Sequence, residues 1–554
     1  MKEFYVSEYK YRFTKKDDKF DNSTHNFVYS TQNNNIFVLK SEDIYMENAK
    51  TLSNQPLLKD LTENLDIIKK HLGEVNDLLI RELILQDGKQ TKAAVLGIDG
   101  LVNTTDSQDF IIKLMTAEFA PEHTVSADAL FGFLRDSWIS MLDTKQSDNF
   151  EELYDNLLTG HNILLVDGCA QLLMFDNKGF PARGVGVPNA EKTLWGPLDS
   201  FVETIRFNTA LLRRRLKDPR LRFDSYKVGR MSKTDVFVAH VEGLTNPEFV
   251  RLAKERIEAI DIDTITNSYE LIQLIEDKHH SLLPRLIETE RPDRVMKALS
   301  EGQVAIFVDG SPYAILGPFH LTSAFSAVDD YYNHPAFATV KRLMRYIAFF
   351  SIILIPGFYI AMTNFHQNMI PTQLLITIIN QRSANPFSTF VEIIIIISLF
   401  EIIREASLRK PDAIGDSMTI AASLIVGTTI VESGLVSYAA IIVGCLTTLA
   451  SFMLSNSRIN TAARLFKFGF MIIGATLGFY GLTLAFIILI LHLTSLTSFN
   501  QAYLAPMAPF NIDDQKDQII KASIWHMKKR PKIFGALDKI RENTSKAIGN
   551  KGGN

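Results

Sequence analysis

The apolar run FSTFVEIIIIISLFEII, from Phe387 to Ile403, sets the architecture of this chain. A helix needs roughly 20 mostly apolar residues to cross the hydrocarbon core of a membrane, and this run comes close to that length. Further apolar runs extend over Tyr346–Phe365, Ile414–Val431, Ser437–Leu454 and Phe466–Phe499. Several runs without a polar face, one after another, favour membrane helices over the buried helices of a soluble core. The sequence therefore predicts an integral membrane protein.

The part of the chain before these runs is charged rather than apolar. Its first residues, MKEFYVSEYKYRF, lack the apolar core of a secretory signal peptide, so we expect this part to stay in the cytosol. The formal net charge of −4 gives no overall basic field, and we expect no nucleic-acid partner. The two cysteines, Cys169 and Cys445, lie in different halves of the chain, and we expect no disulfide between them.

Periodicity and turn residues divide the chain into five predicted segments. Residues 1–56 form a poorly ordered polar extension, 57–158 and 159–340 two small α/β subdomains, 341–510 the transmembrane domain and 511–554 a basic cytosolic tail. The expected strands are short apolar runs that end at Asp-Gly turns, as at Ala93–Ile98, Ile163–Val166 and Val304–Val308. The expected fold is an α/β cytosolic N-terminal region followed by an all-α, multi-pass transmembrane domain of five or six helices.

The choice between five and six spans depends on one long run. Lys341 and Arg342 precede the first span and mark the cytoplasmic side, whereas the loop 364–373 has no Lys or Arg and is expected outside. The run Phe466–Phe499 is too long for one comfortable span, and Gly478 with Gly481 would divide it into two short passes. Two passes give six spans and a cytosolic tail, and one pass gives five.

Four charged residues interrupt the run after Phe387: Glu392, Glu401, Arg404 and Glu405. A charge inside a membrane helix costs about 3 kcal/mol on insertion scales, so such residues usually pair or face a water-filled cavity. Arg404 and Glu405 are expected at the cytoplasmic interface or within a polar network. Glu392 and Glu401 are expected to line a pore or to make polar contacts between helices. Arg404 is the nearest partner in sequence for Glu401.

A second charged cluster, Arg213, Arg214 and Arg215, lies at the end of a helix predicted over Ser200–Leu216. It is either a solvated last turn favoured by the helix dipole or a basic face for anionic lipid or a neighbouring subunit.

The sequence contains no phosphate-binding loop, no paired-His metal motif and no serine nucleophile motif. We therefore predict no enzyme activity, no cofactor and no metal site.

Short motifs spread over most of the chain resemble those of one family. They are Val166-Asp167-Gly168, Gly196-Pro197, Asn208, Leu212-Arg213-Arg214-Arg215, Thr289-Glu290-Arg291-Pro292-Asp293, Val308-Asp309-Gly310-Ser311-Pro312, Phe400-Glu401-Ile402-Ile403-Arg404-Glu405-Ala406 and Lys528-Lys529-Arg530-Pro531. From about Leu57 to Arg530 the chain resembles the A subunits of the spore germinant receptors, the GerA family of endospore-forming bacteria. It departs from the family pattern at Leu198-Asp199 and over residues 500–503.

The resemblance implies a multi-pass protein of the spore inner membrane that helps to trigger germination in response to nutrients. Its implied partners are a permease-like B subunit, a lipoprotein C subunit, further copies of the same chain and membrane lipid. The family A subunit is expected to act as an oligomeric, ligand-gated cation channel. Two other classes stay open, a monomeric secondary transporter and a non-conducting scaffold for other germination proteins. The transporter class leaves the large cytosolic region without a role.

Overall fold

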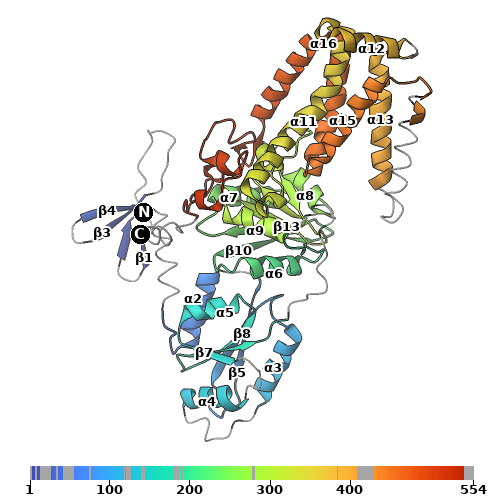
Figure 1. Cartoon of the computed structure of the whole chain (residues 1–554). Coiled ribbons are helices and arrows are strands. Elements are labelled where there is room, and N and C mark those ends of the chain that lie inside the picture. Colours follow the sequence, from blue (N-terminus) through green and yellow to red (C-terminus); the bar gives the residue numbers. More distant parts are fainter. Residues whose placement is uncertain are drawn as a thin grey trace, which may run out of the picture.

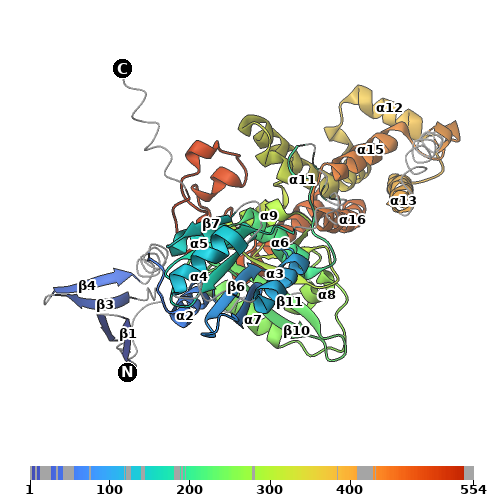
Figure 2. The same ribbon diagram turned by 90° about the horizontal axis from the view of Figure 1, so that it is seen from below.

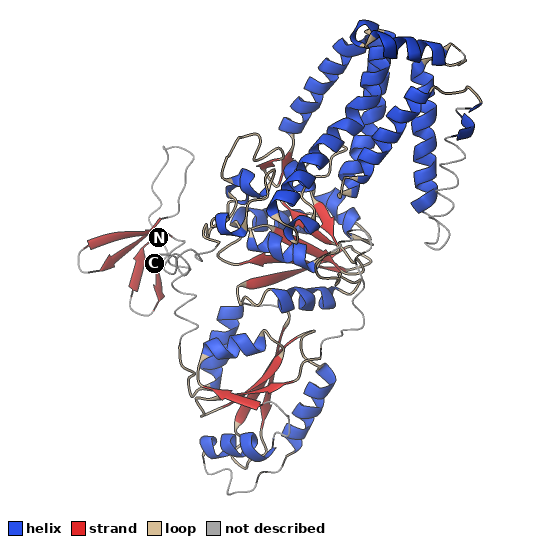
Figure 3. Cartoon of the chain, viewed as in Figure 1, coloured by secondary structure: helices blue, strands red, loops and turns tan. Residues whose placement is uncertain are grey.

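The computed structural model shows three parts that follow one another along a long axis (Figures 1 and 3). They are a first α/β module (residues 55–179), a second α/β module (residues 195–331) and a helical bundle (residues 335–496). A C-terminal segment (residues 497–541) returns to the second module. The structure describes residues 3–6, 9–12, 27–32, 35–40, 55–73, 76–117, 119, 126–138, 144–179, 188, 191, 193, 195–277, 281–383, 385–408, 428–430 and 432–541.

The first module is a five-stranded antiparallel sheet with helices on both faces. The strand order is β5-β6-β8-β9-β7, formed by β5 (Leu78–Ile84), β6 (Lys92–Ile98), β7 (Thr144–Ser147), β8 (His161–Val166) and β9 (Leu172–Asp176). One face carries α2 (Leu61–Leu72) and α5 (Phe150–Leu157), and the other carries α3 (Thr104–Thr116), α4 (Ala127–Phe133) and the π-helix η2 (Leu134–Trp138). Because side chains alternate along a strand, Leu164 and Leu165 enter opposite cores.

The second module repeats this architecture. Its strand order is β10-β11-β13-β14-β12, formed by β10 (Leu221–Val228), β11 (Thr234–Val241), β12 (Ile287–Thr289), β13 (Val304–Val308) and β14 (Ala314–Gly317). One face carries α6 (Ile205–Arg215) and α9 (Pro292–Ser300), and the other carries α7 (Pro247–Glu258) and α8 (Ser268–Ile275). Each module runs through one helix, a hairpin, two helices, a strand, one helix and a second hairpin, so the N-terminal region contains a tandem structural repeat.

The strand pairing corrects the division that we expected at residues 158 and 159. The predicted strand Ile163–Val166 is β8, and it pairs with β6 and β9 in the first sheet rather than with strands of the second. The two sheets therefore separate after Asp176. Turn chemistry located the strand but did not identify β6 as its partner, because whole helices lie between β6 and β8 in the sequence. The predicted hairpin after Val304 is confirmed as β13 and β14, in antiparallel register.

The helical bundle is built on α11 (Pro335–Asn364), which enters from the second module through α10 (Leu321–Ala324) and η3 (Val328–Tyr331). It continues with η4 (Gln367–Met369), α12 (Thr372–Arg382), α13 (Thr389–Leu408), α15 (Tyr438–Phe452) and α16 (Ser457–Ser495). Seen from below, α13 is viewed end on whereas α12 runs lengthwise across the bundle (Figure 2). Most of the predicted run Ile414–Val431 lies outside the described residues.

The chain turns back within α16. Gly478 has φ 59° and ψ −148°, which interrupts the helix, and the two halves meet there at an angle (Figure 1). The start of α16 contacts the second module through an ion pair between Arg458 and Glu288, and its end contacts the same module through His492 Nε2, 2.9 Å from Ser281 Oγ. Both ends of α16 thus lie at the second module. The sequence had indicated Gly478 as a possible break, and the structure has the break at this residue.

One hydrophobic core joins the second module to the bundle. Phe319 and Phe325 from the module pack in the same cluster as Phe349 of α11 and Leu489 of α16. The C-terminal segment closes this region with β15 (Thr497–Ser498), β16 (Gln501–Ala502), η5 (Asp514–Asp517), η6 (Ile524–His526) and η7 (Lys532–Phe534). The second module, α11 and α16 therefore pack as one continuous unit.

The polar N-terminal extension contains four strands that sequence reasoning did not predict. They are β1 (Glu3–Val6), β2 (Tyr9–Arg12), β3 (Phe27–Gln32) and β4 (Asn35–Lys40), paired as two antiparallel hairpins. Their sequences contain aromatic and β-branched residues, which favour strands, within a stretch that is polar on average. Averaged composition therefore concealed the local strand preference.

Candidate functional site

Glu401 on α13 is held by two cations of α16. Its Oε1 accepts hydrogen bonds from Arg464 Nε at 3.0 Å and from Lys467 Nζ at 2.8 Å, and its Oε2 also pairs with Arg464. The Lys467 side chain is only 4% exposed, so this contact is largely shielded from water. Arg464 and Lys467 are three residues apart and therefore share one face of their helix. Arg404, the nearest candidate partner in the sequence, is therefore not the residue that pairs with Glu401.

Arg404 turns instead toward α15. Its NH1 group donates a hydrogen bond to Ser451 Oγ at 2.9 Å, and its guanidinium lies 5.5 Å from the centre of the Phe452 ring. Glu405, the next residue, is exposed. Among the described residues, Glu401 and Arg404 therefore have different partners, because successive residues on a helix point to different neighbours.

Glu392 occupies the other end of α13 and is fully buried. Its carboxylate accepts hydrogen bonds from Asn385 Nδ2 at 3.1 Å and from Ser437 Oγ at 2.8 Å. Among the described residues no cation lies within ion-pair distance of Glu392. The hydroxyl of Thr389, one turn earlier, is buried without a hydrogen-bond partner in the same part of the chain. This end of α13 thus presents a buried carboxylate with only neutral partners.

The first half of α16 connects Glu401 to the second α/β module. Arg458, in the first turn, pairs with Glu288 of β12 and lies 3.9 Å from the centre of the Tyr269 ring. Lys467 is nine residues further along, a distance of about 13 Å on a helix. The first half of α16 therefore contacts the second sheet through Arg458, and it contacts α13 through Arg464 and Lys467.

The start of α11 is fixed by a buried ion-pair cluster. Asp330 Oδ2 lies 2.7 Å from Arg345 NH1 and 3.1 Å from Arg342 Nε, and neither Asp330 nor Arg342 is exposed. Arg342 NH1 also donates to the backbone carbonyl of Asp517 at 2.6 Å. From the sequence, Arg342 was interpreted only as a marker of the membrane edge. The acidic pair before the helix, Asp329 and Asp330, was the available signal for a partner.

The structure corrects the interpretation of the arginine cluster at the end of α6. Arg213 is 1% exposed, and its Nε lies 2.7 Å from Asp77 Oδ2 in the first module. Arg215 pairs with Asp199, and Arg214 is exposed. Arg213 is therefore an internal link between the two α/β modules and is not available to lipid or to another subunit. A buried arginine of this kind requires a paired carboxylate.

The two Asp-Gly motifs have the same role in each structural repeat. Asp167 follows β8 and accepts a hydrogen bond from the backbone N–H of Leu61, the first residue of α2, at 3.1 Å. Asp309 follows β13 and accepts one from Ile205, the first residue of α6, at 3.0 Å. Each carboxylate satisfies a free donor at a helix N-terminus. These family-motif residues maintain the fold of their modules.

Further motif residues complete the same arrangement. Gly168 and Gly310 have φ of 84° and 83°, which favours glycine at each turn. Asn208 Nδ2 donates to the carbonyl of Val202 at 2.6 Å, and Asn64 makes the corresponding bond to Leu58 at 2.7 Å in the first module. The equivalent contacts recur in both modules, so the repeat extends to individual hydrogen bonds.

The third group of motif residues lies where the segment before α6 meets α9. Arg291 is fully buried, pairs with Asp293 at 2.9 Å and donates from NH2 to the carbonyl of Pro197 at 3.0 Å. Pro292 begins α9, and Gly196 has a φ of 113°. No group of three His, Cys, Asp or Glu side chains is placed to hold a metal ion in the part of the chain that the structure describes. Asp167, Asp309 and Arg291 each join separate segments of the α/β modules through these contacts.

These features define a class of protein: a tandem α/β region continuous with a helical bundle that contains buried charges. The model of the Bacillus/Clostridium GerA spore germination protein family matches residues 66–533. The chain belongs to this family of germinant receptor A subunits involved in spore germination.

Two relatives illustrate the extent of the similarity. Spore germination protein KA of Bacillus subtilis (strain 168) is 34% identical over 482 residues, which cover 87% of this chain and 88% of that protein. Spore germination protein B1 of the same organism is 34% identical over 483 residues, which cover 87% of this chain and 99% of that protein. The crystal structure of the N-terminal domain of the A subunit of the Bacillus megaterium spore germinant receptor GerK3 is 29% identical, with a TM-score of 0.37, and covers 48% of this chain and 97% of that domain.

Proposed function

We propose that this chain is the A subunit of a nutrient germinant receptor in the spore inner membrane and forms an oligomeric, ligand-gated cation pathway. It acts there with a permease-like B subunit and a lipoprotein C subunit. Family membership supports the germination role. The buried carboxylate of Glu392, with only neutral hydrogen-bond partners, is the observation that supports cation conduction. Carboxylates inside a helical bundle attract cations when water reaches them.

A multi-pass arrangement with cytosolic α/β modules is part of this proposal. Two helices, Pro335–Asn364 and Ser457–Ser495, are long and apolar enough to cross a membrane. The break at Gly478 makes two passes of the second helix, and α13 and α15 add one pass each. One further pass over the predicted run Ile414–Val431 gives six.

Labelling of single cysteines tests this arrangement. In intact cells an impermeant thiol reagent is expected to modify a Gln367→Cys variant, which lies at the far end of α11 from the modules. It is expected not to modify an Asn246→Cys variant at the start of α7. Labelling of both positions, or of the second alone, contradicts a cytosolic location for the modules.

Substitution of Glu392 tests the conduction proposal. Glu392→Gln removes the negative charge but keeps the side-chain shape and one acceptor, so we expect the bundle to fold. In proteoliposomes the cation flux is expected to fall by about tenfold, which corresponds to a loss of about 1.4 kcal/mol in cation binding. Glu405→Gln, at an exposed position of the same helix, is the matched control and should leave the flux unchanged. Normal flux and selectivity in folded Glu392→Gln protein contradicts the proposal.

A non-conducting scaffold is the second candidate function, and the compensation of Glu401 by Arg464 and Lys467 favours it. A carboxylate neutralised within its own chain holds helices together without attracting a mobile ion. The mass of the detergent-purified protein and ion flux separate the candidates. A ring with flux supports the channel, a ring without flux supports the scaffold, and a monomer with flux supports a transporter.

A further inference from the structure

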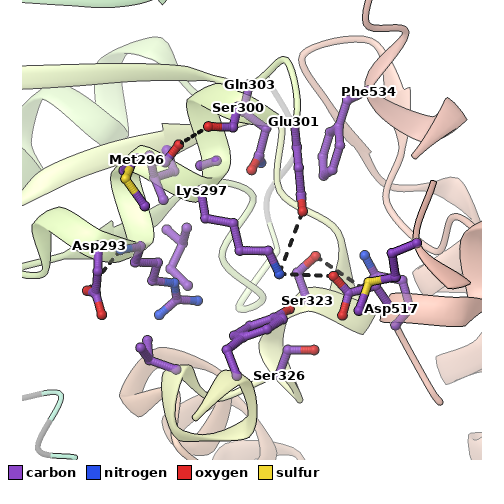
Figure 4. A pocket seen from close by; sticks show the side chains of 18 of the residues that line it. Asp293, Met296, Lys297, Ser300, Glu301, Gln303, Ser323, Ser326, Asp517 and Phe534 are labelled. Carbon is purple, nitrogen blue, oxygen red and sulfur yellow. Dashed lines mark hydrogen bonds and ion pairs between the residues drawn. The ribbon is translucent and has the colours of Figure 1, made fainter. Parts of the chain in front are cut away.

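A cavity of about 460 Å³ lies between the second α/β module, η3 and the C-terminal segment, outside the helical bundle (Figure 4). Small-molecule sites in proteins usually have volumes of about 300–1,000 Å³. The apolar part of the wall includes Met296 of α9, Phe319 after β14 and Phe534 of η7. The cavity therefore brings together segments that are more than 200 residues apart in the sequence.

Lys297 extends across this cavity between two carboxylates (Figure 4). Its Nζ lies 2.9 Å from Asp517 Oδ2 and 3.6 Å from Glu301 Oε1, and 3.1 Å from the centre of the Tyr331 ring. Glu301 Oε1 is buried and accepts no hydrogen bond from the described residues. Arg541 NH1 lies 3.8 Å from the same oxygen, so the polar side of the cavity is a cluster of charged groups whose pairing is incomplete.

Lys521 supplies a second ammonium group from the C-terminal segment. The residue is 7% exposed and lines the cavity, and its Nζ lies 4.5 Å from the centre of the Tyr331 ring. Within the described chain no carboxylate lies within ion-pair distance of this Nζ. Burial and the neighbouring cations lower the pKa of Lys521 to about 8. A buried ammonium without a paired anion is costly and favours an incoming negative charge.

The charges around the cavity do not balance. The cavity is lined by four cations and three carboxylates, which leaves one positive charge in excess: Arg294, Lys297, Lys521, Arg541, Asp293, Glu301 and Asp517. Asp517 is moreover shared with Arg342 of α11, 3.4 Å from its carboxylate. Burial raises the pKa of Glu301, which increases the positive excess when that carboxyl binds a proton.

We propose that this cavity is a binding site for a small organic carboxylate with an apolar body. The carboxylate group lies between Lys521 and Lys297, and the apolar body lies against Met296, Phe319 and Phe534. Such a ligand competes with Asp517 for Lys297, and Asp517 also contacts α11. Occupancy at the site is thereby linked to the start of the first long helix, independently of whether the bundle conducts ions.

Calorimetric titration of the full-length protein in detergent tests this site. The probes are 3-phenylpropionate and the uncharged 3-phenylpropanamide, which have the same apolar body. We expect saturable binding of the acid, and binding of the amide at least about tenfold weaker, since a hydrogen bond between charged groups is worth about 1.5–3 kcal/mol. Equal affinities for the two probes, or no saturable binding of the acid, overturns the proposal.

Variants of Lys521 locate the binding. Lys521→Gln is expected to weaken binding of the acid by at least about tenfold, whereas Lys521→Arg keeps the charge and should stay within about threefold. Lys528→Gln, an exposed lysine of the same segment, is the matched control and should bind normally. Size-exclusion chromatography and circular dichroism establish that each variant is folded. Unchanged affinity in folded Lys521→Gln protein overturns the assignment.

Discussion

Replacement of Glu401 by Gln should weaken the contact between α13 and α16. The carboxylate is shared by Arg464 and Lys467, and removal of its charge leaves both cations without this partner. Breaking a buried pair costs about 3–5 kcal/mol, and because the Glu401 side chain is 22% exposed we expect about 2 kcal/mol here. For a bundle of this size that corresponds to a decrease of about 5 °C in melting temperature.

A thiol-reactive dye measures this melting in the bundle. The chain has two cysteines, and a Cys169→Ser background leaves Cys445 of α15 as the reporter. Combining Glu401→Gln with Lys467→Met gives a double-mutant cycle, for which we expect a coupling energy of about 1–3 kcal/mol. Arg404→Gln is the matched control, because Arg404 contacts Ser451, and its effect should add to that of Glu401→Gln. A coupling energy below about 0.5 kcal/mol between Glu401 and Lys467 would falsify the ion pair.

Three further substitutions test other contacts in the full-length protein. Arg213→Met should lower the free energy of unfolding by about 3 kcal/mol, because it leaves the buried carboxylate of Asp77 unpaired. Arg214→Met, at an exposed position, should change this free energy by less than about 0.5 kcal/mol. Denaturant titration measures both variants, and equal effects contradict the burial of Arg213. Burial lowers the pKa of His320 from 6.5 to about 4. Between these pH values the unfolded state binds more protons than the folded state, so the free energy of unfolding falls by about 3 kcal/mol as the pH decreases from 6.5 to 4. His320→Phe should flatten this pH dependence, and an unchanged pH profile contradicts the prediction. Gly478→Ala should lower the melting temperature, because the backbone conformation at this position costs other residues about 2 kcal/mol. Gly469→Ala, within the regular helix, should be neutral or slightly stabilising. Equal melting temperatures for the two variants contradict the break at Gly478.

Local sequence signals identified several elements of this fold, because the physics behind them is local. Gly478 indicated the break in α16 since glycine adopts backbone conformations that other residues avoid. The Asp-Gly turn after Val308 indicated the hairpin of β13 and β14. The pairing of β8 was not accessible in the same way. Its assignment to the first sheet depends on contacts with β6, across three intervening α-helices, a π-helix and a strand.

The partners of the buried charges were equally non-local. Glu401 and Arg464 are 63 residues apart, and Arg213 and Asp77 are 136 residues apart. The rule that pairs residues three or four apart on a helix therefore gave Arg404 as the partner of Glu401. The rule for basic residues in a last helical turn gave a solvated end for α6 as one of two alternatives, and neither alternative included a partner in the first module. Both rules describe exposed helices, whereas α6 and α13 are each packed against a second element.

The packing of the bundle indicates where movement between its helices is least constrained. A Cβ atom on Gly474 of α16 would lie 2.6 Å from the carbonyl oxygen of Gly357, so α11 and α16 meet backbone to backbone. Both helices also share the core of the second module, and these three elements are expected to move as one unit. The contacts of α13 with this unit include the charged one at Glu401, which a change in the charge of one side chain weakens far more readily than it weakens close backbone packing. A signal that reaches the second module is therefore expected to change the bundle at the boundary between α13 and α16, and the double-mutant cycle at Glu401 and Lys467 measures the strength of that boundary.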